Sequence, residues 1–382
     1  MNNINTKNIS AAEKAIYFAF LSVFLHFAVT GVTIVCLGLF VLFGSQIRRL
    51  IFATKSHILL AVFCGYTAIV ALVYKNYIGI ICSLVVYLIM LIFYWVRSII
   101  TKEILENSLT LCCATAIPLS VAVVIEKIIN ISNAKYRCSL WFFNANYMTA
   151  IFAAVAIFCF YKIIDRSNKK ALYYISAFAC VLAMYLSGSM FAFVELFVGM
   201  CVLLILRKRY LSLALACFLA FLGLVVLYFN PEIFPRILIA SGQTDKRIEV
   251  WEWSISFIKQ HPIFGQGFLT FYHNFLQNPQ IYETTHAHNF VLEPLMSFGI
   301  IGTLMTGLLL WVYFKRVIKC KEKLKDNKII ALVLSICSGV LIHATTDLTL
   351  LWIQTGLLYV LIFASVGIGE RELQNSDNTS LE

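Results

Sequence analysis

YLSLALACFLAFLGLVVLYF, residues 210–229, is a run of twenty residues without a charge. A helix of about 20 apolar residues matches the ~30 Å hydrocarbon core of a bilayer, so this run predicts a membrane-spanning helix. The rest of the chain agrees: its 382 residues are 61% hydrophobic and 13% charged, with a mean hydropathy of +0.86. Soluble domains carry roughly 25% charged residues, which excludes a soluble globular protein, a disordered chain and a cytosolic nucleic-acid binder.

Nine other apolar runs lie on either side of this one, at 57–74, 77–96, 104–125, 142–161, 171–187, 189–206, 289–314, 328–346 and 350–368. A longer run of 29 residues extends from Ala15 to Phe43. As one helix it would reach about 43 Å, which exceeds the ~30 Å core of a bilayer. It is therefore either one tilted span or two short spans that turn near Thr30-Gly31.

The distribution of basic residues decides between these alternatives. With two spans in the first run there are twelve in all, and the loops of one side carry 22 of the 30 Lys and Arg residues, against eight on the other side. Loops rich in Lys and Arg stay in the cytoplasm, which places both termini there. We therefore predict an all-α fold, a polytopic membrane helix bundle of about twelve transmembrane helices, with residues 1–382 forming a single membrane domain.

One connection is far longer than the others. It covers 59 residues, 230–288, between the ninth and tenth spans, and the charge distribution puts it on the external face. Loops longer than about 12–15 residues are uncommon and are usually functional or disordered. This one holds tryptophans, prolines and four of the seven histidines. We expect a folded external structure that contains short helices, here called the cap (residues 230–288).

Within the cap, residues 245–259 (DKRIEVWEWSISFIK) have helical spacing. Their apolar residues lie on two neighbouring faces, and the tryptophans among them, Trp251 included, suit a helix lying at the membrane interface. Arg247 then lies in the first turn, at headgroup depth. We expect the helix to end at His261-Pro262, because the residue before a proline disfavours helical geometry. The two glycines that follow allow a tight reversal.

A second polar cluster, ETTHAHN at 283–289, precedes the next span. His286 and His288 are two residues apart, so they share a face only where the chain is extended. Two interpretations stay open at this point: a polar loop end whose histidines are hydrated, and a functional pair. We predict no metal site, because His-x-His with a nearby Glu lacks the helical i, i+4 ligand spacing of metalloproteases.

Three acidic residues lie within the predicted spans or at their ends, where a charge is costly and marks a functional candidate. Glu293 lies four residues after Asn289, on the same helical face and just inside the external boundary. Asp347 lies at the external end of the eleventh span. Glu195 lies about two turns below the outer edge of the eighth span, where a protonated or hydrogen-bonded interior carboxyl is the preferred interpretation.

The polar residues of the cap form a series of motifs. The series reads R-x-x-x-W from Arg247, H-P-x-x-G-x-G from His261, H-x-H-N-x-x-x-E from His286, and then a glycine pair at 299 and 302. In order, spacing and placement in one long external loop it resembles the O-antigen ligase and O-antigen polymerase superfamily. Outside the cap the similar segments are NANY at 144–147, LSGS at 186–189 and HATTD at 343–347.

The resemblance implies a metal-independent, inverting glycosyltransferase in the inner membrane of a bacterial cell. Such an enzyme moves a glycan from an undecaprenyl-pyrophosphate carrier to a hydroxyl of an acceptor glycan or lipid on the external face. Its expected partners are these two substrates and the membrane lipids, with no nucleic acid and no cofactor.

The resemblance also implies the roles of residues. His288 is the expected general base, with His286 as second choice, and Arg247 is expected to clamp the pyrophosphate, which a guanidinium can hold bidentately. Asn289 or Glu293 could orient the imidazole. The residues expected to bind substrate are His286, Asn289, Glu293, Trp251 and Asp347.

One position departs from the family pattern. An arginine commonly follows the serine at the start of the eighth span, where this chain has Met190, so Arg247 and other external bases would share its task. The alternative function is a twelve-span transporter or a flippase for lipid-linked oligosaccharides. Such folds usually carry internal repeats and a charged site near the midplane, and the sequence contains no such duplication. The motifs do not separate a ligase from a polymerase, since both use the same donor.

Overall fold

The computed structural model describes residues 6–52, 54–133, 136–165, 168–234, 236–324 and 328–379. Over these residues it contains sixteen α-helices, two 3₁₀ helices and no β-strand, which confirms the predicted all-α fold. The first ten helices are α1 (Thr6–Ser22), α2 (Phe27–Phe43), α3 (Ser45–Phe52), α4 (Lys55–Val73), α5 (Tyr77–Ile99), α6 (Lys102–Ile129), α7 (Ala145–Ile164), α8 (Lys170–Leu186), α9 (Met190–Leu206) and α10 (Tyr210–Phe229). The remaining elements are η1 (Pro231–Ile233), α11 (Arg236–Gln260), α12 (Thr270–Gln277), α13 (Leu292–Lys323), α14 (Lys328–His343), η2 (Thr349–Leu351), α15 (Ile353–Ala364) and α16 (Val366–Thr379).

Most predicted spans coincide with a helix, apart from small differences at the ends. Three differ more: α1 begins nine residues before the first apolar run, α13 continues nine residues past the predicted end at 314, and the span predicted at 350–368 is divided between α15 and α16 at Ser365. Seven helical stretches of the described chain are long and apolar enough to cross a membrane. They are α4, α5, α6, α7, α10, α13 and the stretch Ile353–Asn375, which covers α15 and most of α16. Four shorter apolar helices (α2, α8, α9 and α14) accompany them. The chain is therefore a polytopic helical membrane protein. The count of twelve spans stays a prediction.

The first apolar run forms two helices, as the charge distribution predicts, but the predicted turn near Thr30-Gly31 is wrong. The chain turns between Ser22, the last residue of α1, and His26, which precedes α2. The His26 Nδ1 atom accepts a hydrogen bond from the Ala28 N–H group (3.2 Å) and so caps the start of α2. The Thr30 hydroxyl donates to the Ser22 carbonyl oxygen (2.8 Å), so this residue closes the turn from inside α2.

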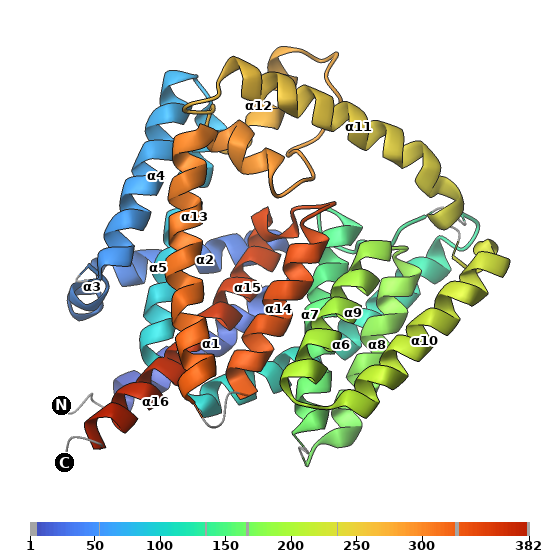
Figure 1. Cartoon of the computed structure of the whole chain (residues 1–382), viewed down its shortest axis with the longest axis horizontal. Coiled ribbons are helices and arrows are strands. Elements are labelled where there is room, and N and C mark those ends of the chain that lie inside the picture. Colours follow the sequence, from blue (N-terminus) through green and yellow to red (C-terminus); the bar gives the residue numbers. More distant parts are fainter. Residues whose placement is uncertain are drawn as a thin grey trace.

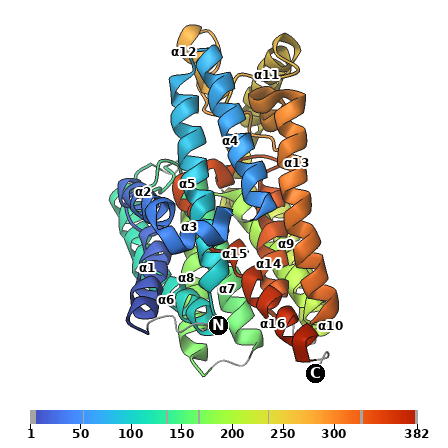
Figure 2. The same cartoon turned by 90° about the vertical axis from the view of Figure 1, so that its left-hand side faces the viewer.

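The helices form an upright bundle, and α11 and α12 lie across its upper end in the view of Figure 1. The view at right angles in Figure 2 shows the same arrangement, with α4, α5 and α13 rising to meet the cap. Helices α1 and α16, which begin and end the described chain, lie toward the lower end in both views. The cap and the two ends of the chain therefore lie at opposite ends of the bundle.

Helix α7 lies in the core of the bundle. It packs against α6, α8, α9, α14 and α15, and 83% of the residues in its most apolar stretch are buried inside the protein. A helix that is apolar on all sides must be surrounded by other apolar groups, and for α7 these are neighbouring helices. Helix α10 is even more apolar than α7 but has no buried residue and lies at the edge of the bundle, where membrane lipid can surround it.

The cap has a small hydrophobic core of its own. Helix α11 is longer than the predicted 245–259, and its side chains Val250 and Phe257 are buried against α12, the loop that follows it, and the start of α13. The face with Ile248 and Ile255 stays exposed, by 46% and 42% respectively. Trp251 and Ile258, which share the face of Ile248 and Ile255, are partly buried against the core of the cap. The exposed apolar strip of α11 is therefore narrower than predicted, and its position at the membrane interface stays a prediction.

The loop after α11 interlocks with a kink in α13. The Gly267 N–H group donates to the Ser297 carbonyl oxygen (2.7 Å), and in return the Ile300 N–H group donates to the Pro262 carbonyl oxygen (2.9 Å). The kink is at Gly299, whose φ of 62° and ψ of −170° are available to glycine but strained for other residues. The H-P-x-x-G-x-G motif and the distal glycine pair thus form one joint between the cap and the membrane helices.

We expect Gly299→Ala to destabilise the protein. A Cβ atom at this position would lie 2.3 Å from the Ile263 carbonyl oxygen, and the backbone conformation alone costs of the order of 1–3 kcal/mol for a non-glycine residue. The thermal unfolding midpoint in detergent should fall by several degrees. Gly307→Ala, in the same helix, is the matched control because its Cβ would meet nothing within 4 Å. Equal unfolding midpoints for the two variants would contradict the role of Gly299 in the joint between the cap and α13.

Candidate functional site

Asp347 is the centre of a cluster of polar side chains at the cap end of the bundle. Its side chain is 3% exposed, and its Oδ1 atom lies 2.9 Å from Nε2 of His286 and 3.3 Å from Nδ1 of His288. The expected partners of the imidazoles, Asn289 and Glu293, are therefore replaced by Asp347, from the loop between α14 and α15. In sequence, Asp347 is 61 residues from His286 and 59 residues from His288.

Glu293 and Asn289 instead build the loop that carries the histidines. The Glu293 carboxylate accepts hydrogen bonds from the Ala287 N–H group (2.8 Å) and the Ser297 hydroxyl (2.9 Å). The Asn289 side chain accepts from the N–H group of Leu292 (3.1 Å) and from that of the residue before it, and so caps the start of α13. Ala287, between the two histidines, is fully buried in the core of the cap.

The backbone at His288 is in the left-handed region, with a φ of 51°. Such a conformation is uncommon for a non-glycine residue and persists only where the surroundings impose it. Here the buried Ala287 on one side and the capping Asn289 on the other fix the backbone. As a result the two imidazoles, whose ring centroids are 4.3 Å apart, face the same carboxylate.

The hydrogen bonds fix which nitrogen of His288 carries a proton in the neutral ring. An ionised carboxylate only accepts, so Nδ1 is the donor to Asp347 and Nε2 keeps a free electron pair. That electron pair faces the hydroxyl of Thr284, at 3.1 Å. In His286, Nε2 donates to Asp347 and Nδ1 lies 2.8 Å from the hydroxyl of Thr285.

The two histidines have opposite pKa shifts. Burial alone lowers the pKa of His286, but its hydrogen bond and charge interaction with Asp347 outweigh burial, and the net shift is upward. Burial lowers the pKa of His288, and the neighbouring His286 and Arg247 lower it further. The hydrogen bonds of both imidazoles hold the pKa of Asp347 well below its usual value, against the effect of burial. His286 therefore favours its cation, whereas His288 favours the neutral form that can accept a proton.

Arg247 lies on the neighbouring helix α11, with its guanidinium over the ring of Phe191, 5.6 Å from the centroid. Phe191 is the second residue of α9, so the guanidinium lies at the N-terminus of that helix. Within the part of the chain that the structure describes, Arg247 forms no hydrogen bond or ion pair. Its effect on the pKa of His288 indicates that the two residues belong to the same electrostatic environment.

Trp251, one helical turn after Arg247, packs against the core of the cap. Its Nε1 atom is buried and has no hydrogen-bond partner among the described residues. The substrate-binding role expected for Trp251 stays a prediction.

Two residues complete the cluster that were not predicted as site residues. The Asn146 amide donates from Nδ2 to the second carboxylate oxygen of Asp347 (2.6 Å), and the Arg137 guanidinium donates from Nη2 to Oδ1 of Asn146 (2.6 Å). Asn146 lies within the NANY segment, which was noted for resemblance alone. No local sequence pattern marks Arg137 as a site residue, because only the fold brings the segment before α7 next to the α8–α9 turn.

The interpretation of Glu195 as a hydrogen-bonded interior carboxyl is confirmed. Its carboxylate lies 2.6 Å from Nδ1 of His343 and accepts a hydrogen bond from the hydroxyl of Tyr359 (3.0 Å). All three side chains are buried. His343 precedes Asp347 by one helical turn, so this interior cluster lies directly below the site.

The side chains of Asp347 and the two histidines are also of the types that bind metal ions in proteins. One ligand atom from each of His286, His288 and Asp347 lies within 4.8 Å of the others. In the present geometry, however, each imidazole nitrogen that faces Asp347 is within hydrogen-bonding distance of the carboxylate, so direct hydrogen bonds satisfy these atoms. A metal ion would have to separate them.

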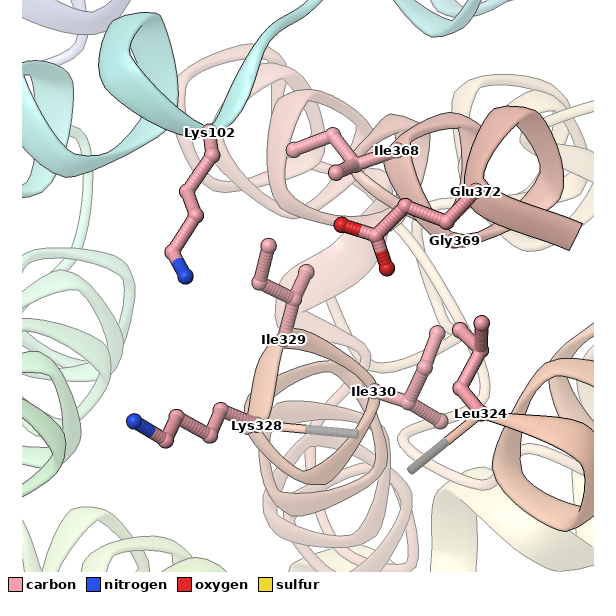
Figure 3. A pocket seen from close by; sticks show the side chains of 8 residues that line it. All are labelled: Lys102, Leu324, Lys328, Ile329, Ile330, Ile368, Gly369 and Glu372. Atoms are coloured by element: carbon pink, nitrogen blue, oxygen red, sulfur yellow. The ribbon is translucent and has the colours of Figure 1, made fainter. Parts of the chain in front are cut away.

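A pocket at the other end of the bundle does not belong to this site. Figure 3 shows the ammonium groups of Lys102 and Lys328 on one side of it and the carboxylate of Glu372 on the other. Lys328 begins α14 and His343 ends it. A helix of 16 residues is about 24 Å long, so the pocket is remote from the histidine pair.

Comparison with known proteins places the site in a family context. No curated protein sequence matches the chain. Residues 175–307, which extend from α8 through the cap into α13 and include Arg247, His286, His288 and Glu293, match the family model described as O-antigen ligase. This match supports the resemblance of the chain to the O-antigen ligase and polymerase superfamily.

Proposed function

We propose that the protein is a membrane glycosyltransferase. It moves a glycan from an undecaprenyl-pyrophosphate carrier to a hydroxyl of an acceptor glycan or lipid. The observation that supports this proposal is the pair His286 and His288 around Asp347, with His286 and His288 inside the segment that matches the O-antigen ligase family model. Arg247 lies in the same segment, on α11, and its charge lowers the pKa of His288. The family itself implies a ligase that handles lipid-linked glycans.

His288 is the general base of the proposed reaction. Its Nε2 electron pair faces a hydroxyl already, that of Thr284, and the acceptor hydroxyl would take this place. Its lowered pKa keeps it neutral at working pH. When Nε2 takes the proton of the acceptor, the imidazolium is stabilised by the Asp347 carboxylate on the other nitrogen, as in other carboxylate–histidine pairs. His286, with its raised pKa, is the weaker candidate.

Arg247 is the clamp for the leaving group. Its guanidinium forms no hydrogen bond or ion pair with the residues that the structure describes, so it can donate two parallel hydrogen bonds to phosphate oxygens. The N-terminus of α9 lies beneath it, and its N-cap residue Ser189 makes no side-chain capping bond. The unpaired N–H groups of a helix N-terminus attract anions. The pyrophosphate of the donor therefore meets a positive charge and the positive end of a helix dipole.

The proposed step conserves atoms and charge. The acceptor oxygen loses its proton to Nε2 of His288 and attacks the anomeric carbon of the donor sugar from the side opposite the pyrophosphate. The bond between that carbon and the pyrophosphate oxygen breaks, and the oxygen keeps the electron pair. The products are a glycoside of inverted configuration and undecaprenyl pyrophosphate, whose negative charge Arg247 balances. No metal ion takes part in this scheme.

The same reasoning gives the proposed topology. Lipid-linked glycans of this kind are used on the external face of the inner membrane, and the excess of basic residues in the loops of the opposite side supports cytoplasmic termini. In this orientation residues 230–288 form the external cap of a single membrane domain. The opposite positions of the cap and the ends of the chain support it.

We expect His288→Ala to lower kcat by about 10²–10⁴-fold, the usual contribution of a positioned general base. The assay incubates purified protein with a lipid-pyrophosphate-linked oligosaccharide and measures both undecaprenyl pyrophosphate release and the transferred glycan. His273→Ala is the matched control, because this cap histidine contacts Gln277 and lies outside the cluster.

The same assay tests the other parts of the proposal. Wild-type turnover should survive treatment with EDTA, and loss of activity that Zn²⁺ restores would instead assign the cluster to a metal centre. Unchanged kcat in His288→Ala would remove the base assignment. Movement of the intact donor across vesicles, without glycan transfer, would identify a flippase.

The pH dependence separates the two histidines. Because the pKa of His288 is lowered, its base form is lost only when the pH falls below the ordinary histidine value of about 6.5. We expect kcat to be flat near neutral pH and to decline on the acidic side with an apparent pKa below about 6.5. If His286 were the base, its raised pKa would move the decline above this value. The measurement is a profile of kcat against pH at saturating donor.

Arg247→Ala should weaken use of the donor. Loss of a charge-assisted hydrogen bond worth about 1.5–3 kcal/mol corresponds to a fall of roughly ten- to a hundredfold in kcat/KM. Arg247→Lys should recover part of this, since an ammonium keeps the charge and loses the bidentate geometry. Lys246→Ala is the control: this neighbouring cation lies over the ring of Tyr282. An effect of Lys246→Ala as large as that of Arg247→Ala would show that only net charge matters.

A further inference from the structure

Arg137 and Asn146 have no part in the proposed chemistry, yet they extend its hydrogen-bond network away from the histidines. Arg137 donates a hydrogen bond to Oδ1 of Asn146 (2.6 Å), and Nδ2 of Asn146 donates one to Oδ2 of Asp347 (2.6 Å). Oδ1 of Asp347 then accepts from the two imidazoles. The four segments that meet here are the chain before α7, α7 itself, the α14–α15 loop and the end of the cap.

The charges of Arg137 and Asp347 fix the direction of the hydrogen bonds that join them through Asn146. A guanidinium can only donate, so it must meet the amide oxygen of Asn146. The amide nitrogen is thereby turned toward Asp347, which as a carboxylate can only accept. An asparagine amide usually can be placed either way round; here Arg137 on one side and Asp347 on the other leave one orientation.

Arg137 is itself held by the turn between α8 and α9. Its Nε atom donates to the carbonyl oxygen of Ser187 (3.1 Å), and the Ser189 hydroxyl donates to the same Asn146 oxygen from 3.4 Å. The fork of a guanidinium suits this task, since Nε and Nη2 bind two acceptors at once in a rigid geometry. Asn146 is therefore fixed from the α8–α9 turn, which also bears the N-terminus of α9 below Arg247.

We propose that Arg137 and Asn146 are positioning residues that act through Asp347 on the base His288. The inference rests on the proposed function, because it assumes that His288 accepts a proton. Asn146 holds one carboxylate oxygen so that the other faces Nδ1 of His288, which keeps the Nε2 electron pair toward the acceptor. Arg137 sets the orientation of the Asn146 amide.

The charged and titratable groups around Asp347 come from several elements. In addition to Arg137 from the segment before α7, they are His286 and His288 from the cap, Tyr147 from α7, Glu293 from α13, Arg247 from α11, and His343 and Glu195 from the interior cluster. Of these groups, only Arg137 is changed in the variants below, and Asn146→Asp adds one carboxylate. A change in the behaviour of His288 then reports the Asn146 link.

Asn146→Asp is the sharpest test. This variant keeps the size of the side chain and an oxygen for Arg137, but it removes the donor to Asp347 and faces it with a second carboxylate. We expect kcat to fall about 10- to 100-fold, the usual effect of losing an outer hydrogen-bond partner, with KM for the donor unchanged within about twofold. Arg137→Met should have a similar effect on kcat, and Arg137→Lys should restore part of it.

A merely structural role of Arg137 predicts a different pattern. Lys127→Met is the matched control, since the Lys127 ammonium binds the Tyr136 carbonyl oxygen (2.9 Å) and so holds the same segment without touching the site. It should leave kcat unchanged. Because Arg137 acts through Asn146, the double variant Arg137→Met with Asn146→Ala should be no slower than Asn146→Ala alone, in which Arg137 has no side-chain oxygen at position 146 to bind. Multiplied losses, equal losses in Lys127→Met, or a raised KM at unchanged kcat would each overturn the proposal.

A second readout does not depend on turnover. Diethyl pyrocarbonate modifies neutral imidazole, and mass spectrometry can follow its reaction at His288 across a range of pH. Asp347 without its Asn146 donor attracts the imidazole proton more strongly, so the apparent pKa of this reaction should rise in Asn146→Asp and stay unchanged in Lys127→Met. An unchanged pKa in Asn146→Asp would overturn the relay. Loss of transferase activity in all proteins, with the shift present, would overturn the proposed function alone.

Discussion

The site depends on the hydrogen bonds that the Asp347 carboxylate accepts. Almost fully buried at the cap end of the bundle, it accepts hydrogen bonds from two histidines of the cap and from an amide of α7. A buried carboxylate is costly unless donors surround it. Here those donors come from segments that are distant in sequence, so the charge is stabilised only when the cap, α7 and the α14–α15 loop are all in place.

Much of this arrangement could be predicted from composition and periodicity. The apolar runs locate the helices to within a few residues, because a bilayer requires about 20 apolar residues for each span. The break at His261-Pro262 and the reversal after it also follow from local chemistry. The turn in the first run does not: Thr30 looked like a break, but its hydroxyl is satisfied by the Ser22 carbonyl, and His26 provides the cap that starts α2.

The residues of the site could be predicted better than the contacts between them. His288, Arg247 and Asp347 were named from the resemblance, but the pairing of Asp347 with the histidines depends on how α14 packs, which no local pattern encodes. Glu293 does not share a helical face with Asn289, because α13 begins only at Leu292. Its carboxylate accepts hydrogen bonds from a backbone N–H group and a serine hydroxyl rather than from an imidazole. Arg137 escaped notice because its neighbours Ser187 and Asn146 belong to other segments.

The joint between the cap and α13 limits how a substrate reaches the histidines. Hydrogen bonds cross it in both directions at Gly267 and Ile300, and the Asn76 side chain at the start of α5 also binds the carbonyl oxygens of Gln266 and Phe268. Lifting this part of the cap would break all these bonds at once and leave buried backbone groups unpaired. This part of the cap is therefore fixed to the membrane helices. In the proposed reaction, the polyprenyl-linked donor would then reach the site laterally, by diffusion within the bilayer.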